Sequence, residues 1–362
     1  MKILYVTTVG STMGFFEEHF KMLLAKGDEI DLAYGLEKPL SKKIKEFGFK
    51  EHIISFSRRP VSVNNLKAYI QICKLIKTEK YDIVHCHTPN ASVITRLVCQ
   101  KYRKKDNLRV FYTAHGFHFF KGAPLLNWLV FYPVEWLCSF FTDTLITINK
   151  EDYELAKKHM HAKRVEYVPG VGIDVDKFKN TVVNKSEKRK ELDIPEDAFL
   201  LVSVGELNKN KNHEVVIRAI AQIDNDKIHY AIAGVGELKD YLLNLAKELK
   251  IDDRVHLLGF RKDVAEIYKA GDVYIHPSFR EGLPVSVMEA MASGLPVIAA
   301  DNRGCRDLCK KNKRYFFKPN DNLMCSKKII DLFSNKTNYV FLNEMWFGID
   351  EILKRMRVLY GE

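Results

Sequence analysis

Short apolar runs alternate with amphipathic segments of helical length along the whole chain. In the first half the apolar runs are ILYVTTV, EIDLAY, HIISF, DIVHCHT, VFYTAHG, TLITIN and VEYVPG, and in the second half they are FLLVSVG, HYAIAGVG, VHLLGF, VYIHPS and PVIAAD. Segments such as HEVVIRAIAQI and LKDYLLNLAKELK carry apolar residues at helical spacing between these runs. The alternation predicts an α/β protein whose parallel sheets have helices on both faces.

A polar, highly charged stretch separates the two halves: VPGVGIDVDKFKNTVVNKSEKRKELDIPEDA. This composition is typical of an interdomain connection, so we place the boundary between residues 169 and 190. The 362 residues suit two domains better than one core. We predict two Rossmann-like domains, 1–170 and 171–344, and a C-terminal helix at 345–362 that packs back towards the first domain.

The cysteines and the apolar stretches bear on where the protein works. Seven cysteines form no CxxC pair and no metal-ligand spacing, so we expect free thiols in a reducing, cytoplasmic compartment. The most apolar region, residues 117–141, contains Lys121, Pro124, Pro133 and Glu135. These interruptions argue against a membrane span, which needs about 20 apolar residues.

The basic charge is concentrated in the first half of the chain. Residues 1–170 contain 26 Lys/Arg and 17 Asp/Glu, a net charge of +9, whereas residues 171–362 contain 31 and 29, a net charge of +2. A basic half with many aromatic residues favours peripheral contact with an anionic membrane surface or an anionic substrate. A solvated basic face is the alternative interpretation. Nucleic acid is not an expected partner, because no RNA- or DNA-binding module is recognisable.

In open parallel sheets, ligands bind beyond the carboxyl ends of the strands, so residues that follow the strands are candidates. The stretch GSTMG, which ends at Gly14, follows the first strand and could bring backbone amides close to a phosphate, although a plain turn is the alternative. Gly205, Lys209 and Lys211 follow the strand FLLVSV, where a lysine can neutralise a diphosphate. A solvated surface lysine is the alternative there.

The stretch EGLPVSVMEAMASG contains two glutamates around the start of a predicted helix over residues 284–293. The helix N-terminus at Gly282 and Leu283 can hold an anion through free N–H groups. Glu281 is too close to such an anion to be its ligand, so we expect it to accept hydrogen bonds from hydroxyls. Glu289 lies further along the helix and could bind another pair of hydroxyls. A diphosphate flanked by two hydroxylated rings is a nucleotide sugar; a helix-dipole contact and a buried ion pair are the alternatives.

This stretch resembles the E-x7-E signature of the retaining nucleotide-sugar glycosyltransferases of family 4, which have the GT-B fold of two Rossmann-like domains facing across a cleft. The resemblance extends over TTVGSTMGFFEEHF, YDIVHCHTP, TAHGFHFFKGAPLLNW, FTDTLITINKEDYELAK, VPGVGIDVDKF, VGELNKNKNH, LGFRKDV and AGDVYIHPSFREGLP. These motifs look most like those of bacterial capsular and exopolysaccharide enzymes, which add a sugar to a lipid-linked oligosaccharide at the inner face of the cytoplasmic membrane.

The resemblance also implies roles for individual residues. It implies that Glu281 contacts the donor sugar and Glu289 the ribose, that Lys211 holds the diphosphate and that Gly14 lies by the phosphates. His115, in TAHG, is implied to lie beside the transferred sugar; a core histidine is the alternative.

Arg261, in LGFRKDV, matches the region around the base, with an exposed arginine that binds no ligand as the alternative. The residues expected to act in catalysis are therefore Glu281, His115 and Lys211, and the donor nucleotide is expected at Gly14, Gly205, Lys209, Lys211, Arg261, Gly282, Leu283 and Glu289.

Two positions depart from the family pattern. Glu206 occupies the place of the usual arginine in VGRL, which leaves open how the second positive charge is supplied, with Lys209 as one candidate. After the last strand of the second half, the usual second glycine of the GG is replaced, since the sequence reads Arg303, Gly304, Cys305, Arg306. Either arginine could add positive charge.

The resemblance and the residues together predict a retaining hexosyl- or N-acetylhexosaminyltransferase that uses a UDP-sugar and a polyprenyl-diphosphate-linked or saccharide acceptor. A sugar phosphorylase or a nucleotide-sugar epimerase of the same fold is the alternative. The DVD of Asp174 and Asp176 resembles a metal-binding DxD, but it follows linker glycines rather than a nucleotide-binding strand. We therefore expect no metal and no cofactor.

Overall fold

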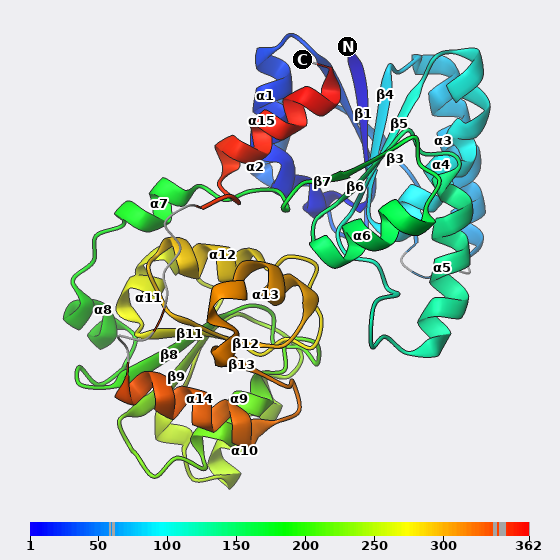
Figure 1. Cartoon of the computed structure of the whole chain (residues 1–362). Coiled ribbons are helices and arrows are strands. Elements are labelled where there is room, and N and C mark those ends of the chain that lie inside the picture. The colour runs from blue at the N-terminus through cyan, green and yellow to red at the C-terminus, as the bar shows by residue number, and fades with distance from the viewer. Residues whose placement is uncertain (58, 60–61, 336–338, 340–344, 362) are drawn as a thin grey trace. The chain divides into compact units, whose positions relative to one another are not determined.

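The computed structural model describes residues 1–57, 59, 62–335, 339 and 345–361, which form two compact units (Figure 1). The first unit comprises Met1–Val171 together with Ile349–Glu362, and the second comprises Gly172–Gly348. Each unit is built on one parallel sheet with helices packed against it. The prediction of two parallel-sheet, Rossmann-like domains is therefore confirmed.

The sheet of the first unit has seven strands in the order β3-β2-β1-β4-β5-β6-β7, all parallel. The strands are β1 (Lys2–Val9), β2 (Glu29–Gly35), β3 (Lys50–Ile53), β4 (Ile83–His87), β5 (Arg109–Ala114), β6 (Thr144–Thr147) and β7 (Arg164–Tyr167). The helices are η1 (Gly10–Phe16), α1 (Glu17–Ala25), α2 (Lys42–Lys45), α3 (Val63–Glu79), α4 (Pro89–Lys105), α5 (Leu125–Ser139), α6 (Lys150–His159) and α15 (Ile349–Tyr360).

The central strands of this sheet are buried on both faces. Every residue of β4 is buried, as are all residues of β1 except the first. Helices cover both sides of a parallel sheet, so such strands read as continuous apolar runs without polar alternation. This burial explains why ILYVTTV and DIVHCHT were recognisable as strands from the sequence.

The C-terminal helix α15 belongs to the first unit and lies beside α1 (Figure 1). Ile352, Met356 and Leu359 are buried in the same apolar cluster as residues of α1. At the end of the helix, the Tyr360 hydroxyl lies 2.6 Å from the Tyr5 hydroxyl and 2.5 Å from His85 Nδ1. The end of the chain thus closes the core around β1 and β4.

The sheet of the second unit has six parallel strands in the order β10-β9-β8-β11-β12-β13. The strands are β8 (Phe199–Val204), β9 (Ile228–Ala233), β10 (Val255–Gly259), β11 (Val273–His276), β12 (Val297–Ala300) and β13 (Phe316–Phe317). The helices are α7 (Val175–Asn180), α8 (Lys185–Glu191), α9 (His213–Ile220), α10 (Lys239–Glu248), η2 (Asp252–Arg254), α11 (Val264–Ala270), α12 (Val285–Ala292), α13 (Arg303–Leu308), η3 (Lys310–Tyr315) and α14 (Asn322–Ser334).

Most of the stretch interpreted as an interdomain connection belongs to the second unit. The chain passes from one unit to the other at Val171, and α7 and α8 then pack against α12 and α11. Arg189, on α8, is buried because its guanidinium donates to Asp272 at 2.7 Å and to three backbone carbonyls. Its charge made the segment look like a solvated linker, although the side chain is structural.

The membrane-spanning potential of the helices can be judged directly. In the described part of the chain, no helix is both long and apolar enough to cross a bilayer. The most apolar helix, α5, has 15 residues and includes Pro133.

The packing of α15 makes its buried face important for the stability of the first unit. Replacing Met356, which is 3% exposed, with alanine should lower the free energy of unfolding by about 2–5 kcal/mol, because a cavity replaces buried methylenes. Val358→Ala, on the exposed side of the same helix, should change it by less than about 0.5 kcal/mol. Urea unfolding of both variants tests this; equal effects would contradict the packing of α15.

Candidate active site

The loops that follow β8 and β11 meet through an ion pair. Lys211 Nζ lies 2.7 Å from Glu281 Oε1, and the two side chains are 23% and 15% exposed. The pair therefore sits at the carboxyl edge of the second sheet, where open parallel sheets bind ligands. Of the residues predicted from the sequence, these two are brought into direct contact.

His276, the last residue of β11, lies behind this pair. Its Nε2 is 3.3 Å from Glu281 Oε1, and its side chain is 2% exposed. Burial alone would raise the pKa of the Glu281 carboxyl, but His276 and Lys211 outweigh it and lower the pKa to about 2. Burial lowers the pKa of His276. Glu281 is thus a carboxylate at neutral pH, and its Oε1 accepts a hydrogen bond from Lys211 and lies 3.3 Å from His276 Nε2.

The backbone of the β8 loop places Lys211 by two devices. A side chain at Gly205 would start 3.3 Å from Lys211 Cε, so the glycine leaves the channel through which the lysine extends. Asn212 takes a left-handed conformation, with φ of 54°, and its amide donates to the carbonyls of Pro277 and Pro319. These bonds tie the loop to the end of β11 and hold the lysine near Glu281.

The helix predicted over 284–293 is α12, which starts and ends one residue inside the prediction. Pro284 caps its N-terminus, and Gly294, with φ of +82°, follows its C-terminus. The loop at Gly282 and Leu283 leads into the helix, whose first amides have no intrahelical acceptor and carry the positive end of the dipole. This end of α12 can bind an anion.

Glu289 lies on the same helix, partly buried, and accepts a hydrogen bond from the Tyr268 hydroxyl at 2.9 Å. Burial raises the pKa of this carboxyl, although the Tyr268 hydroxyl opposes the shift. Tyr268 is itself fully buried on α11, so it fixes the direction of the carboxylate. One carboxylate oxygen receives the tyrosine, and the other can accept a ligand hydroxyl.

The two arginines after β12 lie in different surroundings. Arg303 is buried, and its Nε lies 3.3 Å from the backbone carbonyl of Glu281. Arg306 is exposed and pairs with Asp301 at 2.6 Å. Between them, a side chain on Gly304 would start 2.7 Å from the Gly282 carbonyl oxygen. Of the two arginines, Arg303 therefore lies beside the candidate anion site. Glu206 is exposed in the loop after β8, where its carboxylate accepts a hydrogen bond from the Asn208 amide.

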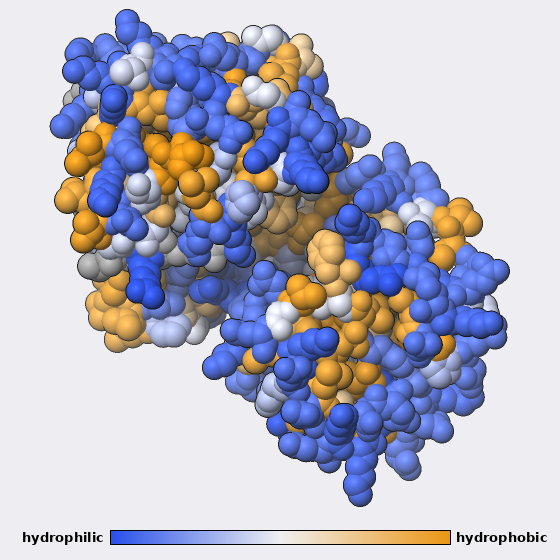
Figure 2. All heavy atoms as spheres, turned by 180° about the vertical axis from the view of Figure 1, so that it is seen from behind, coloured by the Kyte–Doolittle hydropathy of each residue, from blue (hydrophilic) through white to orange (hydrophobic). Residues whose placement is uncertain are grey.

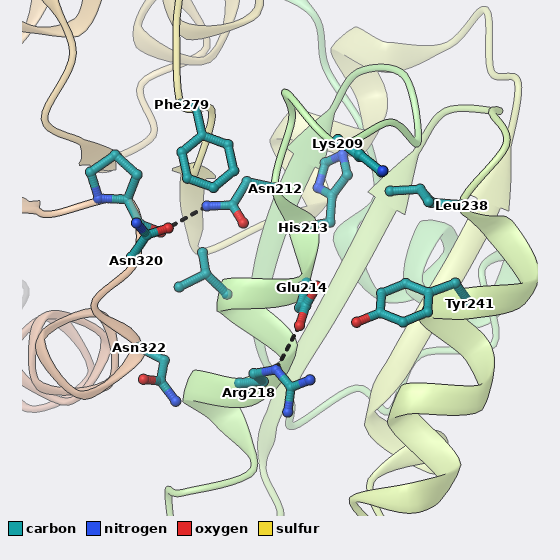
Figure 3. A pocket seen from close by; sticks show the side chains of 12 residues that line it. Lys209, Asn212, His213, Glu214, Arg218, Leu238, Tyr241, Phe279, Asn320 and Asn322 are labelled. Atoms are coloured by element: carbon teal, nitrogen blue, oxygen red, sulfur yellow. Dashed lines mark hydrogen bonds and ion pairs between the residues drawn. The ribbon is translucent and has the colours of Figure 1, made fainter. Parts of the chain in front are cut away.

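Lys209 does not join the Lys211–Glu281 pair. It lines a separate cavity of about 540 Å³ between the start of α9, the start of α10 and the segment before α14 (Figure 3). Glu214 and Arg218, which also line this cavity, form an i,i+4 ion pair along α9. Neither Lys211 nor Glu281 is among the residues that line this cavity.

Arg261 is also occupied by protein groups. It donates to Asp263 at 2.6 Å and 2.8 Å and to Glu191 at 2.5 Å. The sequence suggested a contact with the base or an exposed arginine that binds no ligand. Neither interpretation included the two carboxylates that Arg261 contacts. The ion pairs hold α8 against the loop after β10.

In the first unit, Gly14 and His115 follow the carboxyl ends of β1 and β5, which β4 separates in the sheet. Gly14 is exposed in η1 after β1, and a side chain there would meet no atom within 4 Å, so the backbone faces open space. His115, an exposed residue, follows β5, and its Nε2 lies 3.2 Å from His87 Nδ1 at the end of β4. His115 is therefore a surface histidine supported by a buried one, and not a core residue.

A chain of buried polar groups continues behind His87. His85, also on β4, contacts the hydroxyls of Tyr360 and Thr113 through its two ring nitrogens. Burial, followed by the neighbouring histidines, holds the pKa of His85 and of His87 well below the usual range. Both rings are neutral at pH 7, which makes the support beneath His115 uncharged.

Two aromatic residues of the apolar stretch 117–141 are core residues. Phe117 and Phe119 are 3% and 0% exposed and stack on each other with their ring centroids 4.8 Å apart. Trp128 packs against Phe119. The apolar residues that do reach the surface lie elsewhere on α5.

No group of three or more metal-ligating side chains is arranged to hold an ion in the described ranges. Asp174, the first residue of the DVD motif, accepts the backbone N–H of Lys177 at 2.9 Å and caps α7. All seven cysteines are free thiols.

Sequence reasoning missed His276, Tyr268 and His87. His276 and His87 each end a strand. Both are visible in the sequence, in VYIHPS and DIVHCHT, as polar residues at the end of an apolar run. Tyr268 had no such signal, because an apolar helix position gives no sign of a hydroxyl directed at Glu289.

Comparison with known proteins places these features in a family. Two family profiles match: glycosyl transferases group 1 over residues 184–344 and glycosyl transferase 4-like over residues 2–149. A protein of Bacillus subtilis (strain 168) called EpsD, assigned as a glycosyltransferase, is 36% identical over 338 residues, which cover 92% of this chain and 87% of that protein. The chain belongs to the family 4-like glycosyltransferases.

Further relatives of this glycosyltransferase have more specific names. The UDP-Gal:alpha-D-GlcNAc-diphosphoundecaprenol alpha-1,3-galactosyltransferase of Escherichia coli is 29% identical over 81% of this chain and 76% of that protein. A diphospho-undecaprenol N-acetylgalactosaminyltransferase of Campylobacter jejuni is 24% identical over 84% and 82%.

Solved structures confirm the GT-B fold. The crystal structure of Anabaena HepE in complex with UDP has a TM-score of 0.80 at 19% identity and covers 99% of both chains. WaaG, a glycosyltransferase of lipopolysaccharide biosynthesis, has a TM-score of 0.70 at 16% identity, with 99% of this chain and 100% of that one covered.

The lowered pKa of Glu281 gives the stability of the glycosyltransferase a specific pH dependence. Because its folded pKa of about 2 lies below the ordinary value of 4.5, its stabilisation is complete above pH 4.5 and is lost as the pH falls towards 2. Between pH 7 and pH 4 this group should cost the protein about 1 kcal/mol of unfolding free energy. Glu281→Gln should lack this component in urea unfolding, whereas Glu248→Gln, an exposed variant on α10, should retain it. Parallel pH dependence in all three proteins would refute the ionised pair.

Proposed function

We propose that this glycosyltransferase moves a hexose or N-acetylhexosamine from a UDP-sugar to a lipid-linked oligosaccharide in the assembly of a cell-surface polysaccharide. The observation that carries the proposal is the Lys211–Glu281–His276 cluster at the entrance to α12, with Glu289 on the same helix. It combines a cation, a helix N-terminus and two oriented carboxylates.

The charges of this cluster suit a sugar diphosphate. Lys211 and the amides of Gly282 and Leu283 would hold the diphosphate, and Arg303, beside the Glu281 carbonyl, could replace the positive charge missing at Glu206. Glu281 is ionised and would accept hydrogen bonds from sugar hydroxyls. Glu289, oriented by Tyr268, would accept those of the ribose.

The choice of UDP and of a lipid-linked acceptor is supported by the relatives. The Escherichia coli enzyme is named for UDP-Gal and a diphosphoundecaprenol acceptor, the Campylobacter jejuni enzyme for a diphospho-undecaprenol acceptor, and HepE was solved with UDP. We propose the same donor nucleotide and acceptor class for this chain, and peripheral attachment at the inner face of the cytoplasmic membrane.

We propose retention of the anomeric configuration. The bond from the anomeric carbon to the diphosphate oxygen breaks, the acceptor oxygen bonds to that carbon from the same face, and the acceptor proton passes to the leaving phosphate. Negative charge grows on the diphosphate in this step, so Lys211 and the α12 amides would lower the barrier by electrostatic stabilisation. His115 would lie beside the sugar. These groups supply the charge stabilisation, and we propose that no metal ion is needed.

Calorimetric titration with UDP, GDP and ADP, with and without EDTA, tests the donor site. UDP should bind equally with and without EDTA, and Lys211→Met should weaken binding about 10- to 100-fold, because a charged hydrogen bond contributes about 1.5–3 kcal/mol. Lys227→Met, which removes an exposed lysine paired with Asp197, is the matched control and should bind normally. Loss of binding in EDTA would sink the metal-independent proposal, and equal binding by both variants would remove Lys211 from the site.

Product analysis tests the reaction. NMR of the product formed from an α-linked UDP-sugar should show an α-glycosidic bond, and Glu281→Gln should lower kcat/KM about 10- to 100-fold, since it removes a charged acceptor. Phosphate-dependent cleavage of the product, or conversion of the donor without an acceptor, would instead indicate a phosphorylase or an epimerase. The fold does not separate these, because a structure described as a UDP-N-acetylglucosamine 2-epimerase has a TM-score of 0.67 at 14% identity.

A further inference from the structure

The outward side of α5 is almost entirely apolar. Leu125, Leu126 and Leu129 are 73%, 68% and 66% exposed. Further along the helix and just beyond its end, the exposed apolar side chains are Val130, Val134, Trp136, Leu137 and Phe140. A helix on a soluble surface normally turns charged residues outward, so this face is an unusual surface.

The only charged residue in the sequence of α5 is directed into the protein. Glu135 is 8% exposed, accepts from Arg96 at 2.7 Å and lies 3.1 Å from the Tyr112 hydroxyl. Arg96 is buried and also contacts the backbone of its own helix, α4. The ion pair thus attaches α5 to α4 while removing the only charge that could have solubilised the outer face.

The apolar surface continues onto α3, where Val63, Leu66 and Ile70 are 74%, 63% and 62% exposed. A groove of about 240 Å³ lies among these helices, and its lining includes Asn65 of α3 and Val130, Phe131 and Val134 of α5. In Figure 2, hydrophobic side chains gather along the edge of the first unit where α3 and α5 lie. We call the exposed apolar residues of α3 and α5 the apolar face.

The same part of the chain carries most of the basic charge. Residues 51–150, which include α3, α4 and α5, contain 14 Lys/Arg and 6 Asp/Glu, a net charge of +8 of the +11 of the whole protein. Exposed lysines lie on α3, on α4 and just before α5, at Lys67, Lys74, Lys77, Lys101 and Lys121. Positive charge beside an apolar surface complements an anionic lipid layer, at about 1 kcal/mol per basic residue near the surface.

Two further features favour a bilayer over a protein partner. Trp136 on α5 is 38% exposed, and tryptophan is enriched at the membrane–water interface. In addition, α5 has 15 residues, fewer than the roughly 20 needed to span a bilayer, which suits a helix lying in the interface.

We propose that the apolar face seats the protein on an anionic lipid bilayer, with α5 lying in the interfacial region and the surrounding lysines on the headgroups. The inference rests on the proposed function in one respect: a lipid-linked acceptor is held in the membrane, so the enzyme must reach the bilayer surface to use it. The attachment itself is independent of which sugar or nucleotide is used.

Flotation of the purified protein with vesicles of phosphatidylglycerol and phosphatidylcholine tests this proposal. The protein should float with them and float less with pure phosphatidylcholine. Leu126→Glu/Leu129→Glu should reduce the bound fraction at least about tenfold. The matched control is Val182→Glu/Leu323→Glu, which changes two exposed aliphatic residues of the second unit and should float like the unaltered protein.

Other results would overturn the proposal. These are failure of the unaltered protein to float, equal flotation of the α5 variant, or equal loss in the α5 and control variants. If the protein does not bind vesicles but forms a dimer, and the α5 substitutions dissociate that dimer, the apolar face binds a second copy of the chain instead. The milder Leu126→Gln/Leu129→Gln and a thermal melt show whether any loss comes from misfolding. UDP titration of the α5 variant separates the two proposals: lost flotation with the same UDP affinity as the unaltered protein assigns the loss to the apolar face and not to the donor site.

Discussion

The ion pair between Lys211 and Glu281 is the constraint on which the candidate active site depends. It joins the loops after β8 and β11, and both side chains are largely withdrawn from water. Burying two charges is costly unless each finds further partners, and His276 supplies one for the carboxylate. A diphosphate that approaches Lys211 must share the lysine with Glu281, so donor binding would leave the carboxylate freer to accept sugar hydroxyls. The two predicted functions of the pair are therefore coupled.

The close approach of backbones around this pair explains where the glycines lie. A side chain on Gly205 would press against Lys211, and one on Gly234 would start 1.8 Å from the Gly205 carbonyl oxygen. On the other side, Gly304 lets α13 approach the Gly282 carbonyl. The loops of β8, β9, β11 and β12 thus converge on one point because their glycines carry no Cβ. Arg303 precedes Gly304 without disturbing this contact, because Gly304 is the residue that needs the space.

The sequence predicted the sheets well, because strands covered on both faces consist of unbroken apolar runs. It placed α12 to within one residue, because Pro284 and Gly294 mark its ends. It did not predict β13, whose two residues, Phe316 and Phe317, give no periodicity. At the site, the motif located Lys211 and Glu281. The contacts of Arg261 and Lys209 could not be foreseen, since they depend on carboxylates and a cavity contributed by segments distant in sequence.

Buried ion pairs shape the two units in opposite ways. In the second unit, Lys211 and Glu281 lie at the edge of the sheet, so their charges remain available to a polar ligand. In the first unit, Arg96 and Glu135 are buried as a pair. Their charges therefore do not reach the outer surface of α5. Replacing Glu135 by an apolar residue would leave Arg96 buried and unpaired, which is costly, so the carboxylate must stay although it serves no solvent-facing role. An uncharged helix face is thereby maintained by a charged residue, and the apolar face follows from how α5 is attached to α4.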